Sequence, residues 1–241
     1  MRELTEALIG KTPLREGHIC LDLTCGTGFA TNLLAQKVKT KVTGVDRSAG
    51  MLHQARLNYG DRCEFIQSDV LEYLKKCEPS SIDVITCCWG MGYSKPLALL
   101  RQIKRVLKPG GCIAIIDNSL FSIKEIIRCS FLTFAEQPGK LRNLMRFRFL
   151  PGSFSLRMFF RLLNMKTLYS DDGSKSYTVA SGTEAIERLR ATGAAAGFEY
   201  AAADEDEELI FNRFAEIVEE KCMTPQGIKI THRYLAGIAR K

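Results

Sequence analysis

The 241-residue chain lacks several features that would place it in a protein class at once. No apolar run approaches the roughly 18 residues that a membrane-spanning helix needs. Residues 1–10 do not have the layout of a signal peptide, and no internal repeat is visible along the chain. We therefore expect a cytoplasmic protein without a membrane span.

The nine cysteines lack the paired CxxC spacing of a zinc or redox site. An odd number of scattered cysteines also argues against a disulfide framework. We interpret them as free thiols, most of them buried in strands. A redox or arsenic-handling role for the adjacent Cys87 and Cys88 has no support in the sequence.

Acidic residues are missing from one long segment of the chain. Between Lys140 and Lys166 there are seven basic residues and no acidic one, which equals the whole net charge of +7. The remainder of the chain therefore balances, with 27 basic and 27 acidic residues. Because the charge is local, the net charge is weak support for general binding to nucleic acid, which we do not expect.

Short apolar segments alternate with segments of helical spacing through the first half of the chain. The pattern predicts strands at residues 19–23, 41–46, 63–67, 81–88 and 112–117, with helices at 4–14, 29–38, 48–58, 71–76 and 96–107. This alternation predicts an α/β fold with a doubly wound, mostly parallel sheet and helices on both faces. Such sheets bind ligands outside the carboxyl ends of their strands.

The alternation stops after Asn118. Residues 119–180 combine basic, aromatic-rich helical patterns with a polar stretch at 170–176, and we interpret them as a helical lid inserted after the fifth strand. Helices at 183–196, capped by Ser181 or Thr183, and at 209–220, with strands near 198–202 and 231–239, complete a seven-stranded sheet. We expect one domain over residues 1–241 that contains this insertion.

A glycine turn follows the first predicted strand at residues 22–28. Glycine accepts positive φ and lets the backbone approach a ligand, and the helix after the turn offers free N–H groups. Gly26 and Gly28 fit the first two positions of a dinucleotide-binding GxGxxG motif, but the third position is Thr31. The turn alone therefore indicates a small polar ligand.

Three predicted strands have an acid at or next to their carboxyl ends, namely Asp22, Asp46 and Asp69. A carboxylate after the second strand suits the two hydroxyls of a ribose, and a third acid beside an apolar slot suits the amine of adenine. A single aspartate at such a place is commonly a solvated loop residue or a helix cap. The three together, without a GxxxxGK lysine, favour a nucleoside that carries a compact charged group over a dinucleotide.

Four segments in this order resemble the motifs of the class I S-adenosylmethionine-dependent methyltransferases, in particular the small-molecule group that includes the ubiquinone and menaquinone methyltransferases. They are LDLTCGTG at residues 21–28, VD at 45–46, SDV at 68–70 and RVLKPGG at 105–111. The resemblance covers residues 18–118 well and 183–241 loosely, and it implies a Rossmann-like seven-stranded fold. Thr24 departs from the pattern, because the family usually has glycine there.

The resemblance implies S-adenosylmethionine as the cofactor. Residues 22–28 would hold its methionine end, with a backbone carbonyl near Cys87 or Cys88, while Asp46 would bind the ribose and Asp69 the adenine amine. The full set of cofactor-binding residues implied in this way is Asp22, Thr24, Cys25, Gly26, Gly28, Asp46, Arg47, Met51, Asp69, Val70 and Cys88.

Methyl transfer from a sulfonium requires no protein nucleophile, because positioning can supply much of the rate. A general base is needed only where the acceptor must lose a proton, and the base itself is not identified. The candidates on the acceptor side are Trp89 and Tyr93 for substrate contact, with Tyr93, Asp117, His232 and His53 as possible bases. A structural or exposed position explains each histidine better than catalysis does, whereas core packing explains the two aromatic residues equally well.

The pair Asp117-Asn118 resembles the metal-binding Asp-Asn of catechol-type O-methyltransferases. Those enzymes draw a further carboxylate from the end of the fourth strand, where this chain has Cys87, Cys88 and Trp89. Hard cations prefer oxygen ligands, so we predict no metal. The Asn-Pro-Pro-Tyr-type motif of many nucleic-acid and protein N-methyltransferases is also missing.

Residues 140–166 are the part of the sequence that bears on the methyl acceptor. Fourteen apolar or aromatic residues lie there among the seven cations. One interpretation is a lid over a small, hydrophobic and anionic metabolite, and another is an amphipathic surface that touches an anionic membrane. An ordinary pair of packed helices with solvated arginines is the third. The sequence thus predicts a methyltransferase, with a non-catalytic binding protein of the same fold as the alternative and a nicotinamide-dependent reductase disfavoured.

Overall fold

A computed structural model of the chain describes residues 1–142, 147–191 and 201–241. Its contacts divide the chain into two compact units. The first comprises Met1–Leu120, Arg148–Gly173 and Tyr234–Lys241. The second comprises Phe121–Phe147 and Ser174–Arg233.

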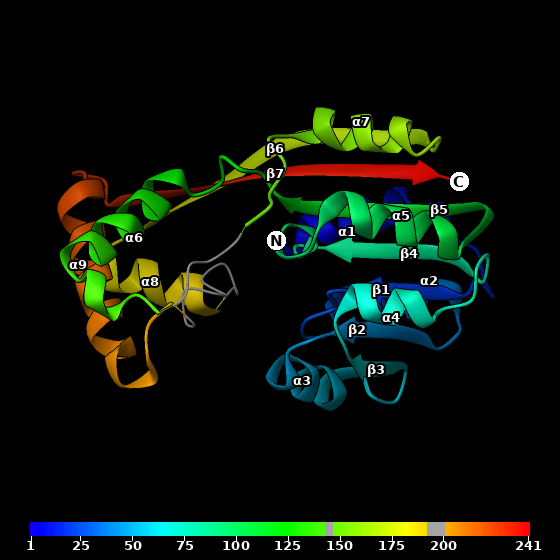
Figure 1. Ribbon diagram of the computed structural model, residues 1–241, viewed down its shortest axis with the longest axis horizontal. Helices are drawn as coiled ribbons and strands as arrows, with labels where there is room; N and C mark the ends of the chain where they lie inside the picture. The colour runs from blue at the N-terminus through cyan, green and yellow to red at the C-terminus, as the bar shows by residue number, and fades with distance from the viewer. Residues whose placement is uncertain (143–146, 192–200) are drawn as a thin grey trace. The chain divides into compact units, whose positions relative to one another are not determined.

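Seven strands form one sheet in the order β3-β2-β1-β4-β5-β7-β6 (Figure 1). They are β1 (Cys20–Leu23), β2 (Val42–Asp46), β3 (Cys63–Gln67), β4 (Ile82–Cys88), β5 (Leu107–Asn118), β6 (Lys166–Val179) and β7 (Ile228–Arg240). The first five strands pair in parallel, and β7 runs antiparallel to β5. This order confirms the predicted doubly wound, mostly parallel sheet, since β1 lies in the middle and the chain moves outward from it twice.

Helices cover both faces of the sheet in the first unit. They are α1 (Arg2–Lys11), α2 (Phe29–Val38), α3 (Ala49–Tyr59), α4 (Val70–Lys76), the short 3-10 helix η1 (Met91–Tyr93), α5 (Pro96–Val106) and α7 (Ser153–Leu162). Alternate residues of each strand serve opposite faces, so Leu21 and Leu23 pack with α4, α5 and α7, whereas Cys20 packs with α1, α2 and α3.

The second unit has a helical core of its own. It contains α6 (Lys124–Glu136), η2 (Pro138–Lys140), α8 (Gly182–Ala191), η3 (Asp204–Asp206) and α9 (Glu207–Cys222). Ile126 of α6, Ile186 of α8 and Phe214 of α9 meet in one apolar cluster. Among the described residues, no helix is both long enough and apolar enough to cross a bilayer.

The predicted helices and strands of the first 118 residues are confirmed to within a few residues at their ends. Ser48 caps α3 by accepting from the Met51 N–H at 3.3 Å, and Ser181 rather than Thr183 accepts from the first turn of α8, from the Glu184 N–H at 3.1 Å. Seven of the nine cysteines are buried, and Cys77 and Cys222 are half-buried.

Residues 108–111, which lie between the predicted helix at 96–107 and the predicted strand at 112–117, belong to β5 as a bulge. Leu107 lies opposite Ile82 and Cys112 lies opposite Val84, so the four residues between Leu107 and Cys112 loop out of the ladder. Gly110 in this loop has φ +80°, a conformation that favours glycine.

The sixth strand is not where the sequence predicted it. β6 lies at residues 166–179, inside the segment interpreted as a helical insertion, and it takes in the polar stretch 170–176. An edge strand that is solvated on both faces carries no apolar run, which explains the error. Of the strand predicted near 198–202, residues 198–200 lie outside the described residues, and Ala201 and Ala202 form a turn and a bend. The end of the helix predicted at 183–196 also falls outside, after residue 191.

Candidate functional site

The glycine turn after β1 holds three left-handed residues within five positions. Thr24, Gly26 and Gly28 have φ values of +56°, +53° and +83°. A Cβ on Gly28 would lie 2.7 Å from the Phe65 ring, whereas one on Gly26 would meet no atom within 4 Å. The backbone at Gly26 is therefore open to the approach of another molecule.

Asp46 connects the ends of β1 and β2. Its Oδ2 accepts from the Gly26 N–H at 2.9 Å, and its Oδ1 accepts from the Ser48 N–H at 2.9 Å. The side chain is half-buried. Because each carboxylate oxygen can accept more than one hydrogen bond, both oxygens keep capacity for a ligand's hydroxyl groups.

Asp22 has a different role from the other strand-end acids. Its side chain is fully buried, and it accepts hydrogen bonds from the hydroxyls of Thr31 at 2.7 Å and Thr86 at 2.6 Å. Burial raises its pKa to about 6, against the lowering effect of the two threonines. Asp22 thus joins β1 to β4 and α2. The only signal for its partners was a threonine in each of two apolar segments.

Asp69 caps α4, as a single aspartate after a strand commonly does. Its Oδ1 accepts from the N–H groups of Leu71 at 2.8 Å and Glu72 at 3.2 Å, and the carboxylate is exposed. Val70 begins the helix, where N–H groups have no acceptor within the helix. Arg47 and Met51, which follow β2, are exposed. The Asp69 Oδ2 and the Val70 N–H are thus the groups available at the end of β3.

Thr24 packs against the loop that follows β4. Its hydroxyl donates to the Leu23 carbonyl at 2.5 Å and lies 3.5 Å from the Cys88 carbonyl oxygen. A Cβ on Gly90 would lie 2.4 to 2.7 Å from three side-chain atoms of Thr24. Because Gly90 has no side chain, there is room beside it for the Thr24 side chain. Cys25, Cys87 and Cys88 are buried.

Asp117, at the end of β5, anchors the turn after β4. Its buried carboxylate accepts from the Gly92 N–H at 2.7 Å and the Asn118 N–H at 2.8 Å. Burial raises the pKa of Asp117 to about 7 and that of Tyr93 to about 12. The Tyr93 ring meets the edge of Phe149 with centroids 5.6 Å apart. Sequence reasoning missed Gly92 and Phe149 as partners of this turn.

The other acceptor-side candidates have contacts of a structural kind. The Trp89 indole N–H donates to the Thr5 hydroxyl at 2.9 Å, and the residue is half-buried. His232, in the second unit, is buried and stacked on Tyr177, with ring centroids 5.7 Å apart. Burial lowers the pKa of His232, which favours a neutral ring. His53 is exposed on α3. Catalytic roles for these residues stay predictions.

Comparison with known proteins relates part of the chain to the methyltransferases. Residues 20–111 match the family profile described as "Methyltransferase domain". The demethylmenaquinone methyltransferase of Lactococcus lactis subsp. lactis (strain IL1403) is 37% identical over 120 residues, which cover 45% of this chain and 47% of that protein. Over this matched part, the chain is similar to the class I S-adenosylmethionine-dependent methyltransferases. It spans about half the length of the curated relatives it matches.

Solved structures of this methyltransferase fold cover nearly the whole chain. The geranyl diphosphate C-methyltransferase of Streptomyces coelicolor A3(2), solved with S-adenosyl-L-homocysteine, superposes with a TM-score of 0.58 at 14% identity, over 99% of this chain and 77% of that one. A [4+2]-cyclase superposes with a TM-score of 0.62 at 19% identity, over 100% of this chain and 80% of that one. At such identities the likeness concerns the fold.

The residues present fit S-adenosylmethionine, the cofactor of the methyltransferases to which residues 20–111 are similar. The backbone at Gly26 is open, α2 begins directly after the turn with free N–H groups for a carboxylate, and Asp46 lies within hydrogen-bond distance of that turn. Among the described residues, no group of three or more His, Cys, Asp or Glu side chains could hold a metal ion. The expectation of a metal-free site stays a prediction.

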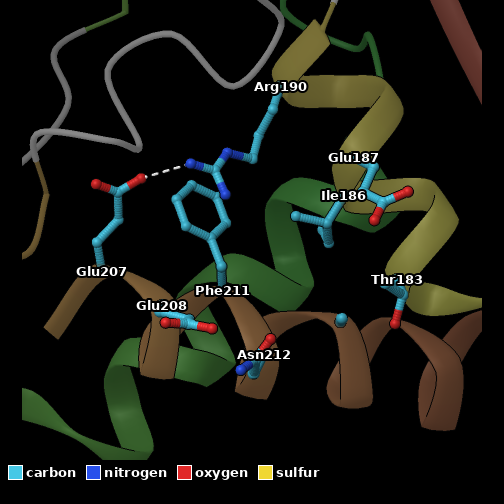
Figure 2. A pocket seen from close by; sticks show the side chains of 9 residues that line it. Thr183, Ile186, Glu187, Arg190, Glu207, Glu208, Phe211 and Asn212 are labelled. Atoms are coloured by element: carbon cyan, nitrogen blue, oxygen red, sulfur yellow. Dashed lines mark hydrogen bonds and ion pairs between the residues drawn. The ribbon is translucent and has the colours of Figure 1, made fainter.

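The second unit contains a cavity of about 400 Å³ between α8 and α9 (Figure 2). The Arg190 guanidinium lies 4.3 Å from the centroid of the Phe211 ring and pairs with Glu207 at 2.7 Å (Figure 2). None of the predicted site residues is among those that line it. Arg190 is thus already paired with an acid from the same unit.

Proposed function

We propose that this protein is an S-adenosylmethionine-dependent methyltransferase that acts on a small hydrophobic metabolite carrying an anionic group. The observation that carries the proposal is the Asp46 carboxylate, bonded to the Gly26 N–H at 2.9 Å. This contact joins the two strand ends that the family motifs assign to the methionine and ribose parts of one ligand. The names of the demethylmenaquinone methyltransferases support a hydrophobic acceptor.

The chain's own residues would act by holding the two reactants. The first turn of α2 would receive the cofactor's carboxylate, Asp46 the ribose hydroxyls, and Asp69 with the Val70 N–H the adenine. The cofactor supplies an activated methyl group, so the protein's contribution to the rate is orientation and exclusion of water. Asp22 would act through the fold, because its carboxylate is fully buried and bonded to Thr31 and Thr86.

The acceptor would lie beside the turn after β4, near Tyr93. Residues 148–150 of the predicted insertion pack on this turn, since the Arg148 N–H donates to the Gly92 carbonyl at 2.9 Å and Phe149 contacts Tyr93. Arg148 is exposed and could meet an anionic group of the acceptor. This packing supports a lid within residues 119–180 of a single methyltransferase domain. We further propose that part of residues 140–166 makes a peripheral membrane contact, and that nucleic acid is not a partner.

The alternative is a protein of this fold that does not transfer methyl groups. It is kept because the chain has Thr24 where the family usually has glycine, and because a [4+2]-cyclase shares the fold. Such a protein could bind S-adenosylmethionine without methylating any acceptor.

Isothermal titration calorimetry with S-adenosylmethionine, and with NADH as the control ligand, tests the cofactor. We expect heat with the first ligand alone. Asp46→Ala should abolish that heat, and Asp46→Asn, which keeps one acceptor oxygen for the turn, should weaken binding with an unchanged circular dichroism spectrum. Absence of heat for the unmodified protein would refute the proposal.

Transfer of a labelled methyl group to a panel of hydrophobic acceptors, with demethylmenaquinol first, tests the activity. Label in the acceptor supports the enzyme. Binding of S-adenosylmethionine without transfer to any member of the panel supports the non-catalytic alternative.

A further inference from the structure

Helix α7 packs into the core of the first unit through its inward face, and this packing does not involve its outward face. Leu156 and Phe160 are buried in the main core of the first unit. The helix begins at Ser153, whose N–H donates to Asp172 at 2.7 Å. Packing and capping of α7 are therefore accounted for by these residues.

The outward face nevertheless carries large apolar side chains. Phe154, Met158 and Leu162 are 64%, 48% and 63% exposed. They are spaced four residues apart, so they form one row along the helix. A row of three large apolar side chains that stay this exposed marks a surface that meets something else.

Two arginines flank this row. A groove of about 490 Å³ runs between α7 and the start of β6, and its described lining includes Arg157 and Arg161 but no acidic residue. Arg157 lies 5.7 Å from the centroid of the Phe154 ring and donates to the Ser170 hydroxyl at 3.1 Å. The surface therefore combines two positive charges with exposed apolar side chains. It is complementary to a partner whose anionic groups lie next to a hydrocarbon layer.

We propose that this α7 surface, made of Phe154, Arg157, Met158, Arg161 and Leu162, docks on a bilayer of anionic phospholipid. The apolar row would enter the boundary between headgroups and acyl chains, and the two arginines would bind lipid phosphates. The inference rests on the proposed peripheral contact of residues 140–166 and assigns it to particular side chains. It does not depend on methyl transfer, so the two can fail separately.

Cosedimentation with vesicles tests the surface. The full chain is mixed with vesicles of phosphatidylcholine alone or with about a third of phosphatidylglycerol. Binding is expected with the mixed vesicles, and it should weaken at high salt because exposed charges are screened. Each basic residue near an anionic surface contributes about 1 kcal/mol, or roughly fivefold in partitioning.

The variants separate charge, apolar contact and fold. Arg157→Gln with Arg161→Gln should lower partitioning roughly 25-fold on that basis, and Phe154→Ser with Met158→Ser should lower it at least tenfold. The matched control is Lys37→Gln with Arg101→Gln, which removes two exposed cations from other helices of the first unit. The control should bind vesicles almost as the parent does, and all variants should keep S-adenosylmethionine binding.

Three results would overturn the proposal. Equal loss of vesicle binding in the control and the α7 variants would show that only net charge matters. Binding of inorganic phosphate without binding of vesicles would identify a small-anion site. A concentration-dependent dimer in sedimentation velocity that the Phe154→Ser, Met158→Ser variant abolishes, with no vesicle binding, would identify a second copy of the chain as the partner.

Discussion

The contact between Thr24 and Gly90 yields a sharp test of the structure. A Cβ added at Gly90 would lie 2.4 to 2.7 Å from three atoms of the Thr24 side chain, and these are the three nearest atoms. Gly90 itself has φ −146°, which is outside the left-handed region that favours glycine. Gly90→Ala should therefore destabilise the protein through overpacking against Thr24, by about 1 to 3 kcal/mol.

Thr24→Gly supplies the second arm of the cycle. It removes the side chain with which a methyl group at position 90 would clash. It also places glycine at a left-handed position with φ +56°, which should raise the free energy of unfolding by about 1 to 2 kcal/mol. Glycine also gives the unfolded chain more conformational entropy, which lowers the free energy of unfolding by about 0.5 to 1 kcal/mol. The single change should thus be close to neutral. In its background, Gly90→Ala should cost less than about 0.5 kcal/mol, because the steric conflict is gone.

Urea unfolding at equilibrium, followed by circular dichroism, measures the four free energies of unfolding in this double-mutant cycle. The expected coupling between the two positions is about 1 to 3 kcal/mol. An equal cost of Gly90→Ala with threonine and with glycine at position 24 would refute the packing described for this pair.

Three further predictions concern buried acids and the acceptor side. Burial raises the Asp117 pKa to about 7 from 3.8, so its contribution to stability is full below about pH 4 and is lost as pH rises through 7. Between pH 5 and 7, the free energy of unfolding measured in urea should therefore fall with pH more steeply for the parent than for Asp117→Asn, by up to about 1.4 kcal/mol per pH unit. Equal pH dependence of the two proteins would contradict this. Thr86→Val removes a hydrogen bond of 2.6 Å from the buried Asp22 carboxylate and should cost about 1 to 3 kcal/mol in the same assay, whereas a neutral effect would show that the bond is dispensable. Arg148→Glu should raise the apparent KM for an anionic acceptor with little change in cofactor affinity, while Arg157→Glu, on α7, should leave that KM unchanged; the reverse order would remove Arg148 from the acceptor site.

Local pattern was sufficient for the frame of this protein. The strands β1 to β5 are buried on both faces and therefore read as apolar runs, and the left-handed positions of the first turn require residues such as Gly26 and Gly28. Asp46 could be located because it follows such a run directly. Among the arginines of residues 140–166, which we call the basic segment, Arg146 lies outside the described residues. Arg148 lies beside the turn after β4, whereas Arg157 lines the groove beside α7.

Tertiary structure decided what the polar side chains do. Asp22 and Asp69 looked equivalent to Asp46 in the sequence, yet one is bonded to two buried threonines and the other caps a helix. The Thr24–Gly90 and Asp117–Gly92 contacts join distant parts of the chain, which no local period reveals.

The basic segment shows the same division between sequence and structure. Sequence by itself determined its charge and its apolar content, because both are sums over residues. Only the fold decided that α7 turns Leu156 inward and Phe154 outward, and that the polar residues after it form an edge strand. Burial and hydrogen bonding between distant residues set those outcomes, since neither is encoded in the spacing of a single segment.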